Sequence, residues 1–95
     1  MSASRAEVWR RLGPPDDQEG SANDPREYED GGVHWNERWC YRLPEGEERW
    51  VLWARADLEA ILRRRADGRV EREIVAGIEP DQRQLGSASD GEAGE

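Results

Sequence analysis

The sequence has 95 residues, with 22 acidic residues against 14 basic ones and a net charge of −8. A chain of this length forms at most one ordinary domain, which excludes multidomain enzymes. Leu, Ile and Val number only 14 and Phe is absent, as in disordered chains, but five Trp and two Tyr residues predict an aromatic core.

The first predicted element is a short helix over about residues 5–12. Ser4 and Glu7 form a capping box, in which the hydroxyl and the carboxylate bind backbone amides at the helix start. Val8 and Leu12 are four positions apart and give the helix one apolar face. A glycine and two prolines follow, which end the helix because proline cannot continue it.

The next segment, residues 14–34, is strongly acidic, with seven acids against one Arg and few large apolar residues. Such a composition buries too little apolar surface to hold a fixed structure, so we expect an acidic loop with disorder over about 14–33. The segment 79–95 has five acids and one Arg, and the same argument predicts an acidic flexible tail. A single α+β domain is therefore expected over residues 1–78.

Residues 35–43 alternate between bulky odd positions and polar even ones, which predicts a strand with a buried odd face. A turn with the sequence Pro-Glu-Gly follows at 44–46. Residues 50–62 then carry apolar side chains at every even position, which predicts one long strand. Because this strand would measure about 43 Å, it should bend or break near 54–57.

A helix competes with a strand over residues 57–67, because several apolar residues there share a helical face and a glycine follows. The continuous even phase and the Ala-Asp-Gly turn beyond it favour a strand and a hairpin. A three-residue loop at 66–68 then sets Arg63 opposite Glu71.

Together these elements predict a two-layer α+β domain. One or two short helices pack on a three-stranded antiparallel β-meander whose central strand is long. We expect Trp9, Trp39 and Trp50 to form the core between the helix and the sheet.

Four short motifs follow one another in the chain: the helix with Val8, then Leu12-Gly13-Pro14-Pro15, then Trp39-Cys40-Tyr41, and last Asp67-Gly68. In this order they resemble the SmpA/OmlA (BamE-like) family of small outer-membrane lipoproteins. The resemblance covers roughly residues 4–75 and implies a helix on a β-meander that serves as a protein-binding scaffold. The family's lipid-bearing cysteine has no counterpart here, because Cys40 lies within a predicted strand.

Candidate catalytic and metal-binding residues are few. His34 is the only histidine and Cys40 the only cysteine, so they cannot complete a metal site. Within one strand they would lie about 20 Å apart, too far for a nucleophile and its base. We therefore expect no enzyme activity, no catalytic residue, no cofactor and no metal. The basic cluster 63–65 has glutamates nearby and is expected to be ion-paired, which argues against nucleic-acid binding.

The candidate partner-binding residues are Val51, Trp53, Ile61 and Val75. They lie on the odd face of the long strand, opposite the expected core, where an exposed apolar strip is typical of an association surface. The sequence thus predicts a non-catalytic protein-interaction domain that binds a partner protein, or a second copy of the chain, through this face. The alternative is that residues 16–34 fold over it.

A second hypothesis of function rests on the acidic segments. In this hypothesis the chain is an acidic inhibitor or a nucleic-acid mimic, whose loop and tail present carboxylates to a basic partner. No apolar run in the sequence is long enough to span a membrane, and its first residues lack a secretory signal. We therefore expect no membrane anchor and a cytoplasmic location, or a periplasmic or envelope location if a native precursor was trimmed.

Overall fold

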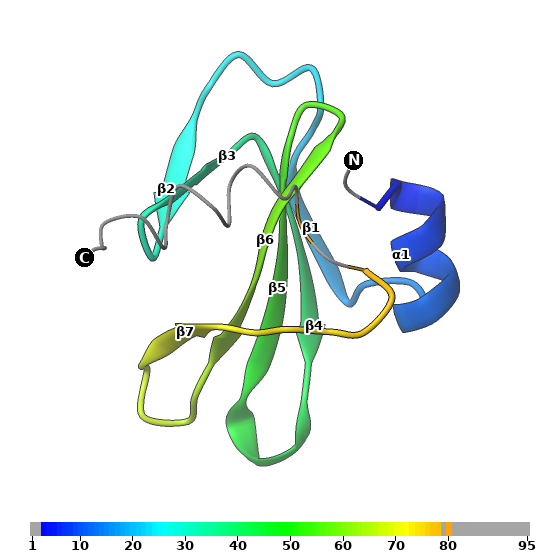
Figure 1. Cartoon of the computed structure of the whole chain (residues 1–95). Helices are drawn as coiled ribbons and strands as arrows, with labels where there is room; N and C mark the ends of the chain where they lie inside the picture. Colours follow the sequence, from blue (N-terminus) through cyan, green and yellow to red (C-terminus); the bar gives the residue numbers. More distant parts are fainter. Residues whose placement is uncertain (1–2, 79, 81–95) are drawn as a thin grey trace, which may run out of the picture.

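The computed structural model describes residues 3–78 and Pro80. In chain order its elements are α1 (Arg5–Leu12), β1 (Asp17–Gly20), β2 (Tyr28–Asp30), β3 (Val33–Trp35), β4 (Glu37–Arg42), the 3-10 turn η1 (Pro44–Gly46), β5 (Glu48–Ala54), β6 (Asp57–Arg64) and β7 (Val70–Arg72). One five-stranded antiparallel sheet has the order β1-β4-β5-β6-β7, and β2 and β3 pair as a separate hairpin (Figure 1). The predicted tail at 79–95 lies, apart from Pro80, outside the described residues.

This architecture differs from the predicted one, which was wrong about the sheet. The described residues are mostly β structure, with a single short helix, instead of a helical layer on a three-stranded meander. The expected long strand is two strands, because the chain reverses at Arg55 and Ala56 and β5 pairs with β6. The break predicted near 54–57 is thus present, but it is a complete hairpin turn.

Helix α1 begins and ends where the sequence predicts. The Ser4 Oγ accepts a hydrogen bond from the Glu7 backbone N–H at 3.2 Å, and the Ser4 N–H donates to the Glu7 carboxylate at 2.8 Å. Gly13 ends the helix with a φ of 82°. Val8 lies on the inward face of the helix and is fully buried, so α1 contributes its apolar face to the core.

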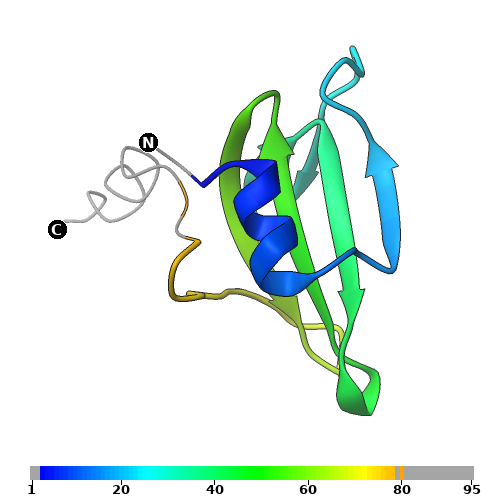
Figure 2. The same cartoon turned by 90° about the vertical axis from the view of Figure 1, so that its right-hand side faces the viewer.

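The sheet is covered on both faces (Figures 1 and 2). Helix α1 covers one face, and the first core cluster there consists of Val8, Trp39, Tyr41, Val51, Trp53, Leu58, Ile61 and Ile78. The β2–β3 hairpin covers the other face, and the second core cluster there consists of Val33, Trp35, Leu52, Ala60 and Leu62. Two thin cores therefore replace the single one that was expected.

The acidic segment 14–34 is not the disordered loop that its composition predicts. It contains β1, β2 and most of β3, and Val33 at its end is fully buried. The Asp24 carboxylate accepts a hydrogen bond from the Arg26 backbone N–H at 2.9 Å, and the Asn36 side-chain amide donates to the Arg26 carbonyl at 2.9 Å. A few buried side chains and many polar contacts thus order a segment that is poor in apolar residues.

The turn between β5 and β6 is held by Arg55, which has a φ of 59°. This left-handed conformation favours glycine, so an arginine there is strained unless other contacts hold it. The Arg55 carbonyl accepts a hydrogen bond from Arg5 Nη2 at 2.6 Å, and Arg55 Nη1 donates to the Ala22 carbonyl at 2.7 Å. The turn is therefore tied both to α1 and to the acidic segment.

The hairpin between β6 and β7 confirms the predicted register. Arg63 lies opposite Glu71, and the Arg65 N–H donates to the Arg69 carbonyl at 2.7 Å, which leaves a three-residue loop at 66–68. The strand prediction for this region is confirmed over the helical alternative.

A cluster of ion pairs fastens the segment after β7 to the sheet. The Glu73 carboxylate accepts hydrogen bonds from Arg49 Nε at 2.7 Å and from Arg63 Nη1 at 2.9 Å, and all three side chains are mostly buried. The hydrogen bond from Arg49 is the main reason that the pKa of the Glu73 carboxyl lies below its ordinary value.

We predict that Glu73→Gln destabilises the fold much more at neutral pH than in acid. A carboxyl whose folded-state pKa is lowered stabilises the fold above its unfolded pKa, and this contribution is lost as the pH falls through the folded pKa. The variant should lower the free energy of unfolding by about 1 kcal/mol at pH 7, measured by urea unfolding, and by much less at about pH 3. Glu45→Gln in the exposed η1 turn is the control. Equal losses at both pH values would contradict the role given to this carboxylate.

Candidate functional site

The predicted partner-binding residues lie in the core and not on the surface. Val51 and Trp53 are 0% exposed and Ile61 is 1% exposed, while Val75 packs against the same cluster. The structure does bring these four residues together, but it does so on the face beneath α1. The covering element is α1 and not residues 16–34, whose hairpin lies on the opposite face. The prediction that this face is exposed was therefore wrong.

The cause of this error is the register between β4 and β5. Cys40 lies opposite Trp50, and Trp39 lies opposite Val51. Because directly opposite residues share a face, the odd positions of both strands face α1. The sequence interpretation put Trp39 and Trp50 on one face, which requires a connection that is one residue longer or shorter.

The first candidate site on the surface is a groove between α1 and β4. It has a volume of about 490 Å³ and is lined by Arg5, Ala6, Trp9, Arg10 and Trp39. The Trp9 ring is 46% exposed and meets the Trp39 ring edge to face, with the ring centroids 5.8 Å apart. Trp9 was expected in the core, but Val8 takes the inward position and the next helical residue points about 100° away from it.

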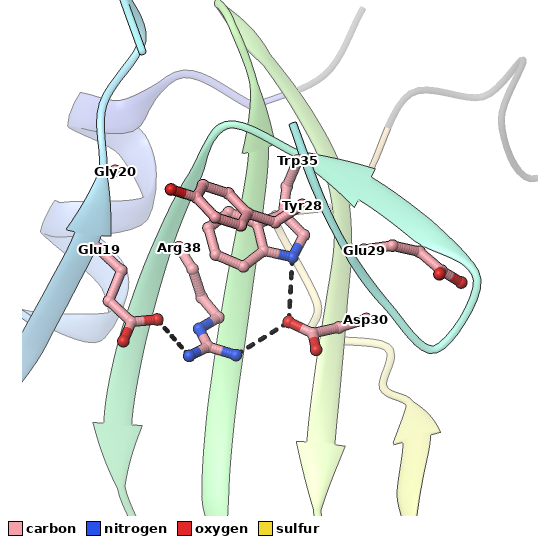
Figure 3. Close-up of a pocket in the computed structure, with 7 residues that line it drawn as sticks. All are labelled: Glu19, Gly20, Tyr28, Glu29, Asp30, Trp35 and Arg38. Atoms are coloured by element: carbon pink, nitrogen blue, oxygen red, sulfur yellow. Dashed lines mark hydrogen bonds and ion pairs between the residues drawn. The ribbon is translucent and has the colours of Figure 1, made fainter. Parts of the chain in front are cut away.

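The second candidate site is a cavity of about 520 Å³ where β1 meets the β2–β3 hairpin (Figure 3). It is lined by Glu19, Gly20, Tyr28, Glu29, Asp30, Trp35 and Arg38. The residues come from four strands, β1, β2, β3 and β4. No local sequence pattern signals this cavity, because its lining depends on how β1 and the hairpin fold back over the sheet.

Arg38 organises the floor of this cavity. Its guanidinium donates to Asp30 Oδ2 at 2.8 Å and also forms an ion pair with Glu19 (Figure 3). It lies over the Trp35 ring at 5.1 Å and over the Trp50 ring at 4.5 Å, within the range of cation–π attraction. The Trp35 Nε1–H donates to the same Asp30 oxygen at 3.0 Å. The carboxylates of Asp30 and Glu19 are thus held in fixed positions.

The charge of the cavity is negative. Tyr28 stacks on Trp35 with the ring centroids 4.7 Å apart, and this pair forms the apolar wall. The Glu29 carboxylate points away from the Arg38 guanidinium and forms no ion pair with any described residue (Figure 3). The cavity lining therefore has three carboxylates against one guanidinium, and the cavity favours cationic groups over anionic ones.

His34 and Cys40 contact separate carboxylates. His34 Nδ1 on β3 lies 3.6 Å from a Glu27 carboxylate oxygen, and the Cys40 thiol on β4 has Glu48 as a neighbour. Burial, followed by the neighbouring Glu48, raises the pKa of the Cys40 thiol to about 11. Such a thiol is protonated at neutral pH and is a poor nucleophile. Within the part of the chain that the structure describes, no group of His, Cys, Asp and Glu is arranged to hold a metal ion.

No protein-family model, curated protein or solved structure matches this chain. The resemblance to the SmpA/OmlA family therefore stays a prediction. Among residues 3–78 and Pro80, no helix has the length and apolar character needed to cross a membrane.

We predict that Trp53 and Trp9 differ sharply in their effect on stability. Trp53→Ala removes a fully buried side chain and should lower the free energy of unfolding by about 3–5 kcal/mol. Trp9→Ala, at a half-exposed position, should cost about 1 kcal/mol. Thermal and urea unfolding followed by circular dichroism measure both. A Trp53 variant of normal stability would restore the hypothesis of an exposed sheet face.

We also predict that the cavity depends on Gly20. This residue has a φ of 71°, and a Cβ atom there would lie 2.0 Å from the Asn36 carbonyl oxygen. Gly68 is a matched control, because its φ is 92° but nothing lies within 4 Å of the added Cβ. In both variants the alanine must adopt a left-handed conformation, which lowers the stability of the fold. Only Gly20→Ala adds a clash with the backbone. It should therefore lower the melting temperature clearly more than Gly68→Ala, and equal shifts would contradict the close approach.

Proposed function

We propose that this chain is a non-catalytic protein-interaction domain that binds a basic partner protein through its acidic segment, residues 14–34. The observation that carries the proposal is the folded state of this segment. Its β1 strand and its hairpin place carboxylates at fixed positions around a cavity of about 520 Å³, which a disordered acidic loop would not do.

The distribution of charge supports this proposal. The acidic segment has seven acids and one Arg, whereas the other described residues have ten acids and twelve Arg. The negative charge is therefore concentrated on the side of the molecule that carries β1 and the hairpin. A concentration of one sign steers an oppositely charged partner and fixes its orientation on docking.

Preorganisation of the carboxylates supports it further. Asp30 is held by Trp35 and Arg38 at the cavity, and the buried Asp24, held by the Arg26 side chain, fixes the backbone of the segment. The hydrogen bond from the Arg26 side chain is the main reason that the pKa of the Asp24 carboxyl lies below its ordinary value, so this carboxyl is ionised at neutral pH. Groups that are already ordered lose little further entropy when a partner binds, which favours affinity.

The hypothesis that a partner binds the apolar face of the sheet has less support. A sheet face built on Val51, Trp53 and Ile61 is buried under α1 and offers no surface to a partner. The acidic hypothesis also used the carboxylates of segment 79–95, but this segment lies outside the described residues except for Pro80. The proposal therefore rests on residues 14–34 alone.

A matched pair of double variants tests the proposal. Glu27→Gln with Glu29→Gln removes two charges from the hairpin, and Glu45→Gln with Asp57→Asn removes two exposed charges elsewhere. The probe is a hexa-arginine peptide, titrated by calorimetry into the full chain at low and at physiological salt. The hairpin variant should bind the peptide several-fold more weakly, with a shallower salt dependence, because exposed charges act over about 10 Å. The control should bind it almost as the unchanged chain does.

Equal weakening by both variants would mean that the peptide senses only the net charge of −8, and it would overturn the proposal. Circular dichroism of each variant checks that the fold is retained.

A further inference from the structure

The groove between α1 and β4 has a character opposite to that of the acidic cavity. We propose that this groove is a second docking surface, which binds an apolar segment of a partner protein that is flanked by Asp or Glu residues. The inference goes beyond the proposed function and does not depend on it, because the groove shares no residue with residues 14–34.

The apolar part of the groove is exposed and well supported. Trp9 and Ile74 are the large apolar residues that stand out as exposed among those described, at 46% and 71%. The Trp39 ring beneath Trp9 is only 3% exposed, and its Nε1–H donates to Glu37 Oε2 at 2.8 Å. A half-exposed Trp on a fixed aromatic support is typical of the residues that contribute most to binding at interfaces.

The polar part of the groove is positively charged. Helix α1 carries three Arg and one Glu. Arg5 is neutralised, because its guanidinium forms a 2.6 Å ion pair with Glu37. Arg10 lines the groove and attracts the Glu7 carboxylate of the same helix, which helps to lower the pKa of that carboxyl, but no direct ion pair joins Arg10 to a described residue. In a chain of net charge −8, this guanidinium beside Trp9 makes the groove complementary to a carboxylate next to an apolar side chain.

A second copy of the chain suits the groove less well than a separate partner does. The most acidic described segment of a second copy is residues 14–34, where the large aromatic residue is Tyr28. That ring is stacked on Trp35 within its own molecule and is not available as an anchor. Residues 81–95 of this chain contain Leu85 among acidic residues, so they are the competing occupant that the experiment must separate from a partner.

The test uses a blocked peptide of sequence Glu-Glu-Leu-Leu-Glu-Glu, titrated into the full chain labelled with 15N. The indole N–H signal of Trp9 and the amide signal of Ala6 should shift on binding. Trp9→Ala should weaken binding about tenfold, whereas Ile74→Ala, which removes the other exposed apolar side chain, should not. Arg10→Gln should weaken binding several-fold, whereas Arg72→Gln, with the same change of charge, should not. Arg10→Gln leaves both rings in place, so it tests the site even if Trp9→Ala alters the fold.

Three results would overturn the inference. The first is equal binding by the Trp9→Ala variant and the unchanged chain. The second is binding of the matched peptide Lys-Lys-Leu-Leu-Lys-Lys at the Trp9 signal with the same affinity. The third is a several-fold gain in peptide affinity in the Leu85→Ser variant of the full chain, because it would show that residues 81–95 already occupy the groove. An unchanged affinity in that variant supports a separate partner.

Discussion

Strands β5 and β6 are apolar on both of their faces. Both faces of the sheet must therefore be covered, and the rest of the structure supplies the two covers. Val51, Leu52 and Trp53 are consecutive and fully buried, and three consecutive residues of β6, at 60–62, are also buried. Because neighbouring residues of a strand point to opposite faces, neither face of the sheet can remain in water. One cover is an eight-residue helix and the other is a hairpin drawn from the most acidic part of the chain.

The second cover explains why an acidic segment folds at all. Val33 and Trp35 supply apolar contacts to the sheet, β1 pairs with β4, and arginines from the sheet add further attachments. Arg38 and Arg55 reach the segment from β4 and from the β5–β6 turn, through Asp30 and through the Ala22 carbonyl. At Arg38 the planar guanidinium lies over two tryptophan rings and, in the same position, forms ion pairs with two carboxylates.

Local signals were sufficient for the elements whose contacts are local. The capping box and Gly13 define α1, and the Ala-Asp-Gly sequence defines the loop at 66–68, because each depends on neighbouring residues only. The β5–β6 turn gave no such signal. Arg55 stands where a glycine would be expected, and it is held there by Arg5 and the acidic segment, which are distant in sequence. The apolar phase also continues across the turn, so the sequence alone describes one long strand.

The candidate sites were harder to predict, because they depend on which face each residue occupies. A bulge adds to this difficulty, since Leu52 lies opposite Ala60 but Trp53 lies opposite Leu58, so one extra residue shifts the phase of β6. Trp53 was expected on the surface and Trp9 in the core, and the structure exchanges them. Composition correctly located the negative charge, but it did not show that the charge would be ordered.

The two candidate surfaces are a consequence of the two covers. The cavity lies on the face that the hairpin covers, and the groove lies on the face that α1 covers, so the sheet stands between them. Their charges are opposite, because the hairpin belongs to the acidic segment and α1 carries three Arg against one Glu. A segment that fits one surface is therefore disfavoured at the other by its own charge. If both proposals hold, two partners of opposite charge bind this small domain at the same time, one on each side of the sheet, without competing for a residue.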